Sequence, residues 1–200
     1  MSWPREGGWL ARWGLPPEEI EGRSRDRAQA LAARRWDGLQ RDLAAAVLYA
    51  SGDASLVDSI SLLGEPPAQP TRVLVDVSMV RSGLRAGLDC LVAVEATGAD
   101  ALARRSSSTR SAAGLALLWE VQGQGGLVAI GNSPTALLAC LDLAAAGPPS
   151  FVIATCPGFT LAEQAKRALV ESGLPHLAVL GTRGGSPLAA AAINALWGRG

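Results

Sequence analysis

Three charged side chains in this sequence stand where they could bind an anionic ligand or move a proton. Asp76 lies near the end of the apolar run 71–77, and Arg110 opens a helical pattern. Arg183 lies in the segment 181–186, GTRGGS, whose glycines allow close approach of the backbone to an anion. Because arginine pairs with carboxylates through two parallel hydrogen bonds, we expect a carboxylate-bearing ligand. Asp76 as a cap of the turn that follows it, and Arg110 as a solvated side chain, remain the structural alternatives.

Other kinds of chemistry find little support. The single histidine, His176, precedes a predicted strand and so lies at the strand's amino end, where we interpret it as structural. It supports no Ser-His-Asp or Cys-His arrangement. Cys90, Cys140 and Cys156 are widely spaced in apolar surroundings, so we expect buried thiols, with no disulfide framework and no metal site. The GTRGGS loop matches neither a dinucleotide-binding fingerprint nor a Walker A loop.

The segment 127–138, LVAIGNSPTALL, shows how the chain positions such residues. Leu127–Ile130 is apolar without alternation, which is typical of a parallel strand buried on both faces. Gly131 and Asn132 begin a tight turn, Ser133 is the expected helix N-cap, and Pro134 suits the first helical position. Helix N-termini at this edge of an α/β sheet are where ligands bind.

The same strand–turn–helix pattern repeats along the chain. The predicted strands are 71–77, 90–95, 127–132, 151–155 and 177–181. Alternation with helices predicts a parallel sheet covered on both faces, with the turns at one edge. Before the sheet we predict a helix beginning at Pro17, a long helix over 24–50, a short helix over 54–61 and a proline-rich connector over 64–70. We expect Gly52 to cap the long helix and Asp53 to cap the short one.

The first 17 residues form an irregular arm that carries Trp3, Trp9 and Trp13. We expect these rings to pack on the body or on a partner subunit; stacking on a flat ligand is the alternative. At 200 residues we predict one α/β domain, with 1–70 as arm and connector and 71–197 as the repeats.

Bulk properties favour a cytoplasmic protein. The net charge is zero, so we expect neither nucleic acid nor an anionic membrane as partner. We predict no signal peptide and no membrane span. The 17 arginines against one lysine, Lys166, reflect either genome composition or carboxylate binding.

A set of motifs, taken in order and spacing, resembles the precorrin-8X methylmutase family. The matching segments are 20–24 (IEGRS), 76–80 (DVSMV), 109–113 (TRSAA), 129–137 (AIGNSPTAL), 157–159 (PGF) and 183–196 (RGGSPLAAAAINAL). The resemblance covers roughly 17–196. It implies a flavodoxin-like, three-layer α/β/α fold with a five-stranded parallel sheet and an N-terminal helical arm, usually as a homodimer.

The resemblance also implies an activity. The family moves a methyl group from C11 to C12 of precorrin-8X, a corrin-ring precursor of cobalamin, or of the cobalt-containing intermediate. The reaction is an intramolecular rearrangement and needs no cofactor. The protein must hold a flat polycarboxylate in one shape and help to protonate a ring nitrogen. The implied substrate-binding residues are Ser24, Asp76, Met79, Arg110, Gly131, Asn132, Gly158, Phe159, Arg183, Gly184, Gly185 and Ser186.

The family's proton-donating histidine is replaced here. Tyr49, in the segment 48–52 (LYASG), stands in its position and becomes the candidate catalytic residue. Where the family has Glu-Ser-Lys, this chain has Glu163-Gln164-Ala165-Lys166. Reference pKa values of phenol and imidazole differ by about 3.5 units, which implies a rate lower by roughly 50-fold if half the difference reaches the transition state. A non-catalytic corrinoid carrier and a nucleotide-binding α/β domain are the alternatives.

Overall fold

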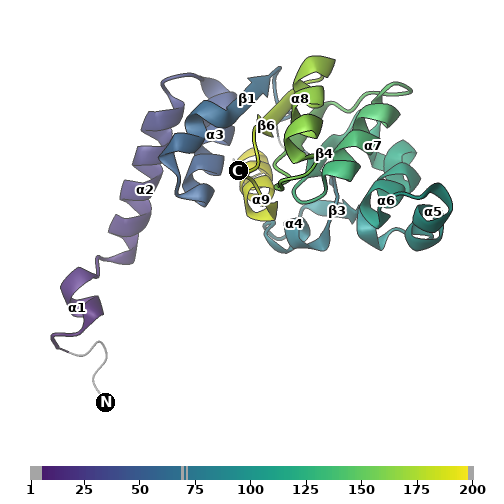
Figure 1. Ribbon diagram of the computed structural model, residues 1–200. Helices are drawn as coiled ribbons and strands as arrows, with labels where there is room; N and C mark the ends of the chain where they lie inside the picture. The colour runs from purple at the N-terminus through teal and green to yellow at the C-terminus, as the bar shows by residue number, and fades with distance from the viewer. Residues whose placement is uncertain (1–5, 69, 71, 198–200) are drawn as a thin grey trace.

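A mixed β-sheet runs through the centre of the molecule and carries helices on both faces (Figure 1). The computed structural model describes residues 6–68, 70 and 72–197. In this part of the chain the strands are β1 (Ile60–Leu63), β2 (Arg72–Val75), β3 (Asp89–Val92), β4 (Leu127–Ile130), β5 (Phe151–Ala154) and β6 (His176–Val179). Their order across the sheet is β1-β6-β5-β4-β2-β3.

The order of the parallel strands confirms the flavodoxin-like prediction. All neighbours from β3 to β6 pair in parallel, and β2 lies between β3 and β4. Numbered along the chain, these five strands follow the order 2-1-3-4-5 of flavodoxin-like folds. The chain moves to one side from β2 to β3 and to the other side from β4 onward, so the direction reverses between β2 and β4.

The prediction missed the sixth strand. β1 pairs antiparallel with β6; its first two residues fall in the short helix predicted over 54–61, and the predicted connector over 64–70 begins directly after it. Its four residues are too few to show a period, and its position at the sheet edge gives it one neighbour to pair with. A 3₁₀ helix, η1 (Ala54–Ser59), precedes it and is capped by Asp53 as predicted.

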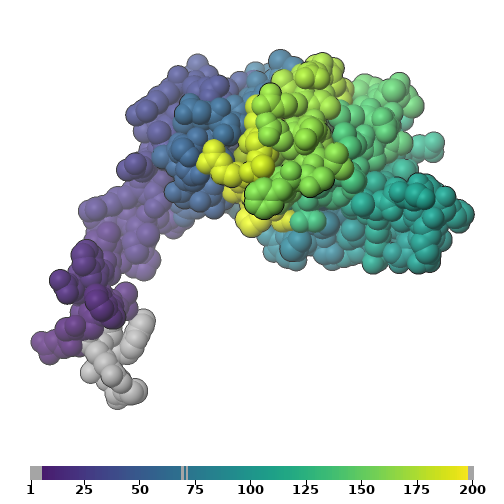
Figure 2. Space-filling model, in the orientation of Figure 1, coloured from purple at the N-terminus to yellow at the C-terminus, as the bar shows by residue number. Residues whose placement is uncertain are grey.

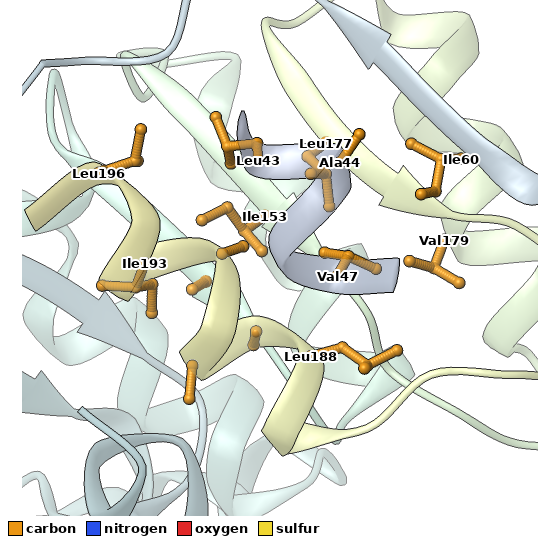
Figure 3. Close-up of a cluster of buried hydrophobic side chains, with 14 of the residues drawn as sticks. Leu43, Ala44, Val47, Ile60, Ile153, Leu177, Val179, Leu188, Ile193 and Leu196 are labelled. Carbon is orange, nitrogen blue, oxygen red and sulfur yellow. The ribbon is translucent and has the colours of Figure 1, made fainter. Parts of the chain in front are cut away.

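The helices divide into two layers. Those after η1 are α4 (Ser78–Ser82), α5 (Ala99–Ser106), α6 (Arg110–Leu118), α7 (Pro134–Ala144), α8 (Ala162–Ser172) and α9 (Ser186–Trp197), with short helical turns η2 (Ala93–Glu95) and η3 (Trp119–Gly123). One core joins α3 (Gly38–Ser51), α4 and α9 to the sheet, and the other joins α6, α7 and α8. Figure 3 shows the first, where Val47 of α3 and Ile193 of α9 surround Ile153 of β5.

The single long helix predicted over 24–50 is wrong. The chain forms a hairpin of α2 (Pro17–Ala32) and α3 (Gly38–Ser51), with a turn at Ala33–Asp37 and a positive φ of 54° at Gly38. The apolar period continues through Trp36 because both helices bury a face in the same core, so the pattern alone hides the turn. Gly52 ends α3 with φ 64°, as predicted.

The N-terminal segment projects away from the body (Figures 1 and 2). Across the described residues 6–27, no side chain is buried. Trp9 and Trp13, in α1 (Trp9–Trp13), are 78% and 70% exposed, so packing on the body is wrong for these two rings. Trp3 lies outside the described residues.

Candidate active site

Two neighbouring hollows flank the end of α3. The larger is a groove of about 580 Å³ between α2, α3 and α9, and Tyr49 lines it. The smaller, of about 300 Å³, begins at the next residue, Ala50, and extends to Arg183 and Gly184. Both volumes lie in the range of small-molecule sites. The groove is lined by Arg25, Ala28, Gln29, Asp42, Ala45, Ala46, Tyr49, Arg85, Ala191, Asn194 and Ala195.

The groove joins an apolar lining to polar and charged groups. Five alanines give it small side chains, which suit a flat ligand face. Tyr49 is 44% exposed, so its side chain remains accessible to a ligand. Asn194 of α9 accepts a hydrogen bond from the Arg85 N–H at 2.9 Å and donates to the Gly83 carbonyl at 2.8 Å. It thereby fixes the segment after α4, which brings Arg85 to the groove that Arg25 also lines.

Arg25 and Arg85 were missed by the sequence reasoning. Arg25 adjoins the predicted Ser24 on α2, and Arg85 follows the short α4. Arg25 directly follows the motif 20–24 without belonging to it, and Arg85 lies in no motif, so only the folding of α2 onto α3 and α9 reveals that both line the groove. Ser24 itself is exposed, and its hydroxyl donates to the Ile20 carbonyl at 2.7 Å within α2.

Asp76 directly follows β2, where the order in which the chain adds strands to the sheet reverses. Its side chain shapes the turn after β4. Its buried carboxylate accepts hydrogen bonds from the N–H groups of Gly131, Asn132 and Ser133 at 2.9, 2.8 and 2.7 Å. Burial raises the pKa of Asp76, while these three bonds act in the opposite direction. Asp76 is therefore structural, but the turn it caps is the one after β4 and not the predicted one that follows Asp76 in the sequence. The three N–H groups, which we expected to face a ligand, already have an acceptor inside the protein.

The α7 N-terminus follows the sequence prediction closely. The Ser133 hydroxyl accepts from the Ala136 N–H, and Pro134 begins the helix. A chain of hydroxyls joins it to the start of α6: Ser111 donates to Ser133 at 2.8 Å, and the hydroxyls of Thr109 and Thr135 lie 2.7 Å apart. Asn132 is exposed at this edge, while Gly131 is buried beneath it.

Gly131 brings the β4 turn against α9. A Cβ on Gly131 would lie 2.5 Å from a methyl of Val80 and 3.0 Å from Cα of Ser186. The Ser186 hydroxyl, buried at the first position of α9, has no hydrogen-bond partner among the described residues. The predicted residues Asp76, Gly131, Asn132 and Ser186 thus gather at one place, the carboxyl edge of β2 and β4.

The loop 181–186 lies at the same edge. Arg183 forms an ion pair with Asp53 and donates hydrogen bonds to the hydroxyls of Ser55 and Ser59, both at 2.9 Å. The side-chain and backbone hydrogen bonds of Ser55, followed by Arg183, keep the pKa of Asp53 below its usual value. Arg183 therefore connects this loop to η1, and a ligand carboxylate would have to compete with Asp53.

Arg110 and Met79 lie on the other side of the edge. The Nε of Arg110 lies 3.3 Å from a carboxylate oxygen of Asp100, and Met79 is exposed. Next to Met79, Arg81 donates two hydrogen bonds to Glu95, at 2.5 and 2.7 Å, and this pairing lowers the pKa of Glu95. Neither Arg81 nor Glu95 was predicted as a site residue, although Glu95 ends the strand predicted over 90–95 and Arg81 directly follows the motif 76–80.

Two further predicted residues, Gly158 and Phe159, form the turn after β5. Gly158 has φ 144°, and its N–H donates to the Thr182 carbonyl at 3.0 Å. Phe159 is 97% exposed. The turn therefore touches the 181–186 loop through its backbone and presents an aromatic ring outward.

His176, Cys90 and Cys140 lie away from this edge, whereas Cys156 follows the carboxyl end of β5. His176 starts β6, and its ring bonds to the Ser61 hydroxyl and the Leu174 carbonyl, which confirms its structural interpretation. Cys140 and Cys156 are buried, Cys90 is half-buried, and burial raises the pKa of all three. In the described ranges there is no group of three or more His, Cys, Asp or Glu side chains suited to a metal ion.

None of the helices in the described residues is long and apolar enough to cross a membrane.

Comparison with known proteins gives a consistent result. A model of the precorrin-8X methylmutase family matches residues 19–198. A cobalamin biosynthesis protein of Archaeoglobus fulgidus is 36% identical over 80% of this chain. The matched region covers about a third (35%) of that longer relative. A precorrin-8X methylmutase of Pseudomonas aeruginosa is 35% identical, covering 77% of this chain and 81% of the relative. The crystal structure of a precorrin-8X methylmutase from Thermus thermophilus superposes with a TM-score of 0.76 at 26% identity, covering 90% of this chain and 94% of that chain.

Proposed function

Because this chain belongs to the precorrin-8X methylmutase family, we propose that it is an isomerase of cobalamin biosynthesis. In this proposal it moves a methyl group from C11 to C12 of precorrin-8X, or of its cobalt-containing counterpart. The observation that carries the proposal is the family match over residues 19–198, which includes α2 from its third residue on, the whole of α3 and every turn at the carboxyl edge.

The groove beside Tyr49 supports a flat, anionic substrate. Its alanines suit the apolar faces of a macrocycle, and Arg25 and Arg85 supply cations for peripheral carboxylates. At the sheet edge, Asn132, Arg110, Met79, Phe159 and the loop from Arg183 to Ser186 would hold the rest of the ring. Asp76 would contribute by keeping the β4 turn in shape, since its oxygens are engaged with that turn.

Tyr49 would act on a nitrogen of the ring. The methyl group leaves one ring carbon for its neighbour within the same molecule, so no group is added or lost. The phenol O–H of Tyr49 would donate a hydrogen bond or a proton to the ring nitrogen and so stabilise the charge distribution of the rearranging ring. For this step the protein would have to place a general acid within hydrogen-bond distance of the ring nitrogen.

We also propose that the chain works in the cytoplasm as a homodimer. The family resemblance supports the dimer. The absence of a disulfide among the cysteines, which all lie in the described residues, agrees with a reducing compartment.

The direct test is turnover of precorrin-8X by the purified protein. We expect the absorbance of hydrogenobyrinic acid to develop, with the Pseudomonas aeruginosa relative as a positive control. If the control turns over and this protein does not, the enzymatic proposal is wrong. A spectral shift on adding hydrogenobyrinic acid, without turnover of precorrin-8X, would instead identify a corrinoid carrier.

A further inference from the structure

Lys166, in the middle of α8, is a buried cation that the reaction does not use directly. It is the single lysine of a chain with 17 arginines, and its side chain is 0% exposed. Its ammonium donates a hydrogen bond to the backbone carbonyl of Arg183 at 3.1 Å. Burial lowers the pKa of Lys166. A cation is costly to bury unless its interactions offset the lost hydration, so this contact calls for a physical reason.

The choice of lysine over arginine points to the geometry of the contact. An ammonium is a compact point donor, whereas a guanidinium is a wide planar fork that needs several acceptors in its plane. Every other basic side chain of this sequence, His176 aside, is an arginine. The one lysine, Lys166, occurs where a buried side chain donates to a single backbone carbonyl. The compact ammonium group suits such a contact better than the wide guanidinium group.

The loop that receives this bond cannot fix its own shape. Gly184 and Gly185 have φ of 150° and 131°, and glycine gives a backbone little conformational preference. On one side the loop is held by Thr155, whose carbonyl accepts from the Gly185 N–H at 2.5 Å. A Cβ on Gly184 would lie 1.9 Å from the same carbonyl oxygen, so the loop lies flat against β5. Lys166 holds it at the neighbouring residue, Arg183.

We propose that Lys166 is the positioning residue of this site. Its ammonium fixes the Arg183 peptide, and with it the direction of the Arg183 side chain and the start of α9 at Ser186. It acts through the loop and does not touch the substrate. The effect of Lys166 on substrate binding rests on the proposed function. The contact between Lys166 and the Arg183 carbonyl does not depend on that function.

The first test measures the loop without any ligand. In Lys166→Met, which has a side chain of similar length without the charge, the amide of Gly185 should exchange with solvent at least about tenfold faster, as for loss of one charge-assisted hydrogen bond. The Gly158 amide, bonded to the same loop at Thr182, should respond likewise. Amides of β4 should keep their rates. Unchanged exchange at Gly185 and Gly158 would overturn the proposal.

The second test measures binding of hydrogenobyrinic acid by spectral titration. Lys166→Met should raise the Kd about tenfold, and the double variant with Arg183→Met should be little weaker than Arg183→Met alone, because both changes disable one loop. Additive losses would contradict an action through Arg183. If the wild-type protein neither binds nor converts a corrinoid, the proposed function fails, and the exchange measurement still decides the role of Lys166.

Two further variants separate positioning from general stability. Leu169→Ala removes a fully buried side chain of the same helix that packs in the core and not on the loop. It should lower the free energy of unfolding yet leave the Gly185 amide protected and the Kd of the folded protein unchanged. Lys166→Gln keeps an N–H donor and should give an exchange rate between wild type and Lys166→Met. A rate above that of Lys166→Met would count against the proposal.

Discussion

At the scale of single residues, the carboxyl edge is ordered by groups that pair with one another inside the protein. Asp76 and Lys166 are both buried, and each holds the backbone of one turn. Arg183 and Asp53 connect two segments far apart in the sequence. The chemistry proposed for Tyr49 therefore takes place beside a surface whose shape is set by buried charges.

Replacing Tyr49 by histidine should raise the rate of methyl migration on the order of 50-fold, because imidazolium is a stronger acid than phenol by roughly 5 kcal/mol and about half of this reaches the transition state. The measurement is kcat for precorrin-8X under saturating substrate. Tyr49→Phe, which keeps the ring and loses the O–H, is the matched control and should fall below wild type. A Tyr49→His variant slower than wild type would mean that the phenol has a role histidine cannot take.

His176 should make the fold less stable as the solution becomes acidic. In its neutral form the ring can donate to the Leu174 carbonyl and accept from the Ser61 hydroxyl, and burial, which disfavours the charged form, lowers the pKa of the ring. The unfolded chain takes up a proton near the ordinary pKa of about 6.5, so stability present above that pH is lost as the pH falls below it.

Urea unfolding at about pH 7.5 and pH 5.5 tests this, since exposed carboxylates change charge mainly below that range. His176→Gln, which cannot be protonated, should lose less stability between the two pH values than wild type. Equal losses in both proteins would show that the histidine is protonated in the folded state.

At the scale of secondary structure, caps and strand–turn–helix units follow local rules, while close approaches between elements do not. Ser133, Pro134 and Gly52 act as their residue types predict. The approach of α6 to η2 depends on Gly114, where a Cβ would lie 1.8 Å from the Ala93 carbonyl oxygen. Nothing in the sequence around Gly114 distinguishes it from a chance glycine in a helix.

Two glycine-to-alanine changes in helices should therefore have opposite effects. Gly114→Ala should lower the free energy of unfolding by about 2–3 kcal/mol, because the methyl group has no space. Gly22→Ala, on the projecting part of α2 with nothing within 4 Å of its added Cβ, should raise it by roughly 0.5–1 kcal/mol through helix propensity. Denaturant unfolding compares the two with wild type. Destabilisation by both changes would mean that α2 does not project freely.

At the scale of the whole molecule, the sheet order decides where a ligand can bind. The reversal between β2 and β4 opens the carboxyl edge at Asp76 and Gly131, and the α2–α3 hairpin adds a groove along α9. The segment from Gly7 to Arg27 has no part in either core. It carries Trp9 and Trp13 into solvent, and a five-residue helix such as α1 gains little stability by itself.

Removing residues 1–16 should leave the free energy of unfolding within about 0.5 kcal/mol of wild type, because the described side chains of this segment are exposed. Urea unfolding of the shortened and the full chain, at low protein concentration, makes the comparison. A larger loss would show that Trp9 and Trp13 pack on the body in solution.

The sequence by itself determined the five parallel strands, their turns and the helix caps, because each depends on a few neighbouring residues whose periods and turn chemistry are visible in the chain. It also determined the family, through motifs that lie at those turns. Only the tertiary structure decided that Asp76 and Lys166 bind backbone groups, that Arg183 pairs with Asp53, and that Arg25 and Arg85 both line the Tyr49 groove. Those contacts join residues from separate elements, and their distances arise from packing that no local pattern records. The break between α2 and α3 was also decided by the tertiary structure alone. Both helices bury a face in the same core, so the apolar period continues through the turn between them.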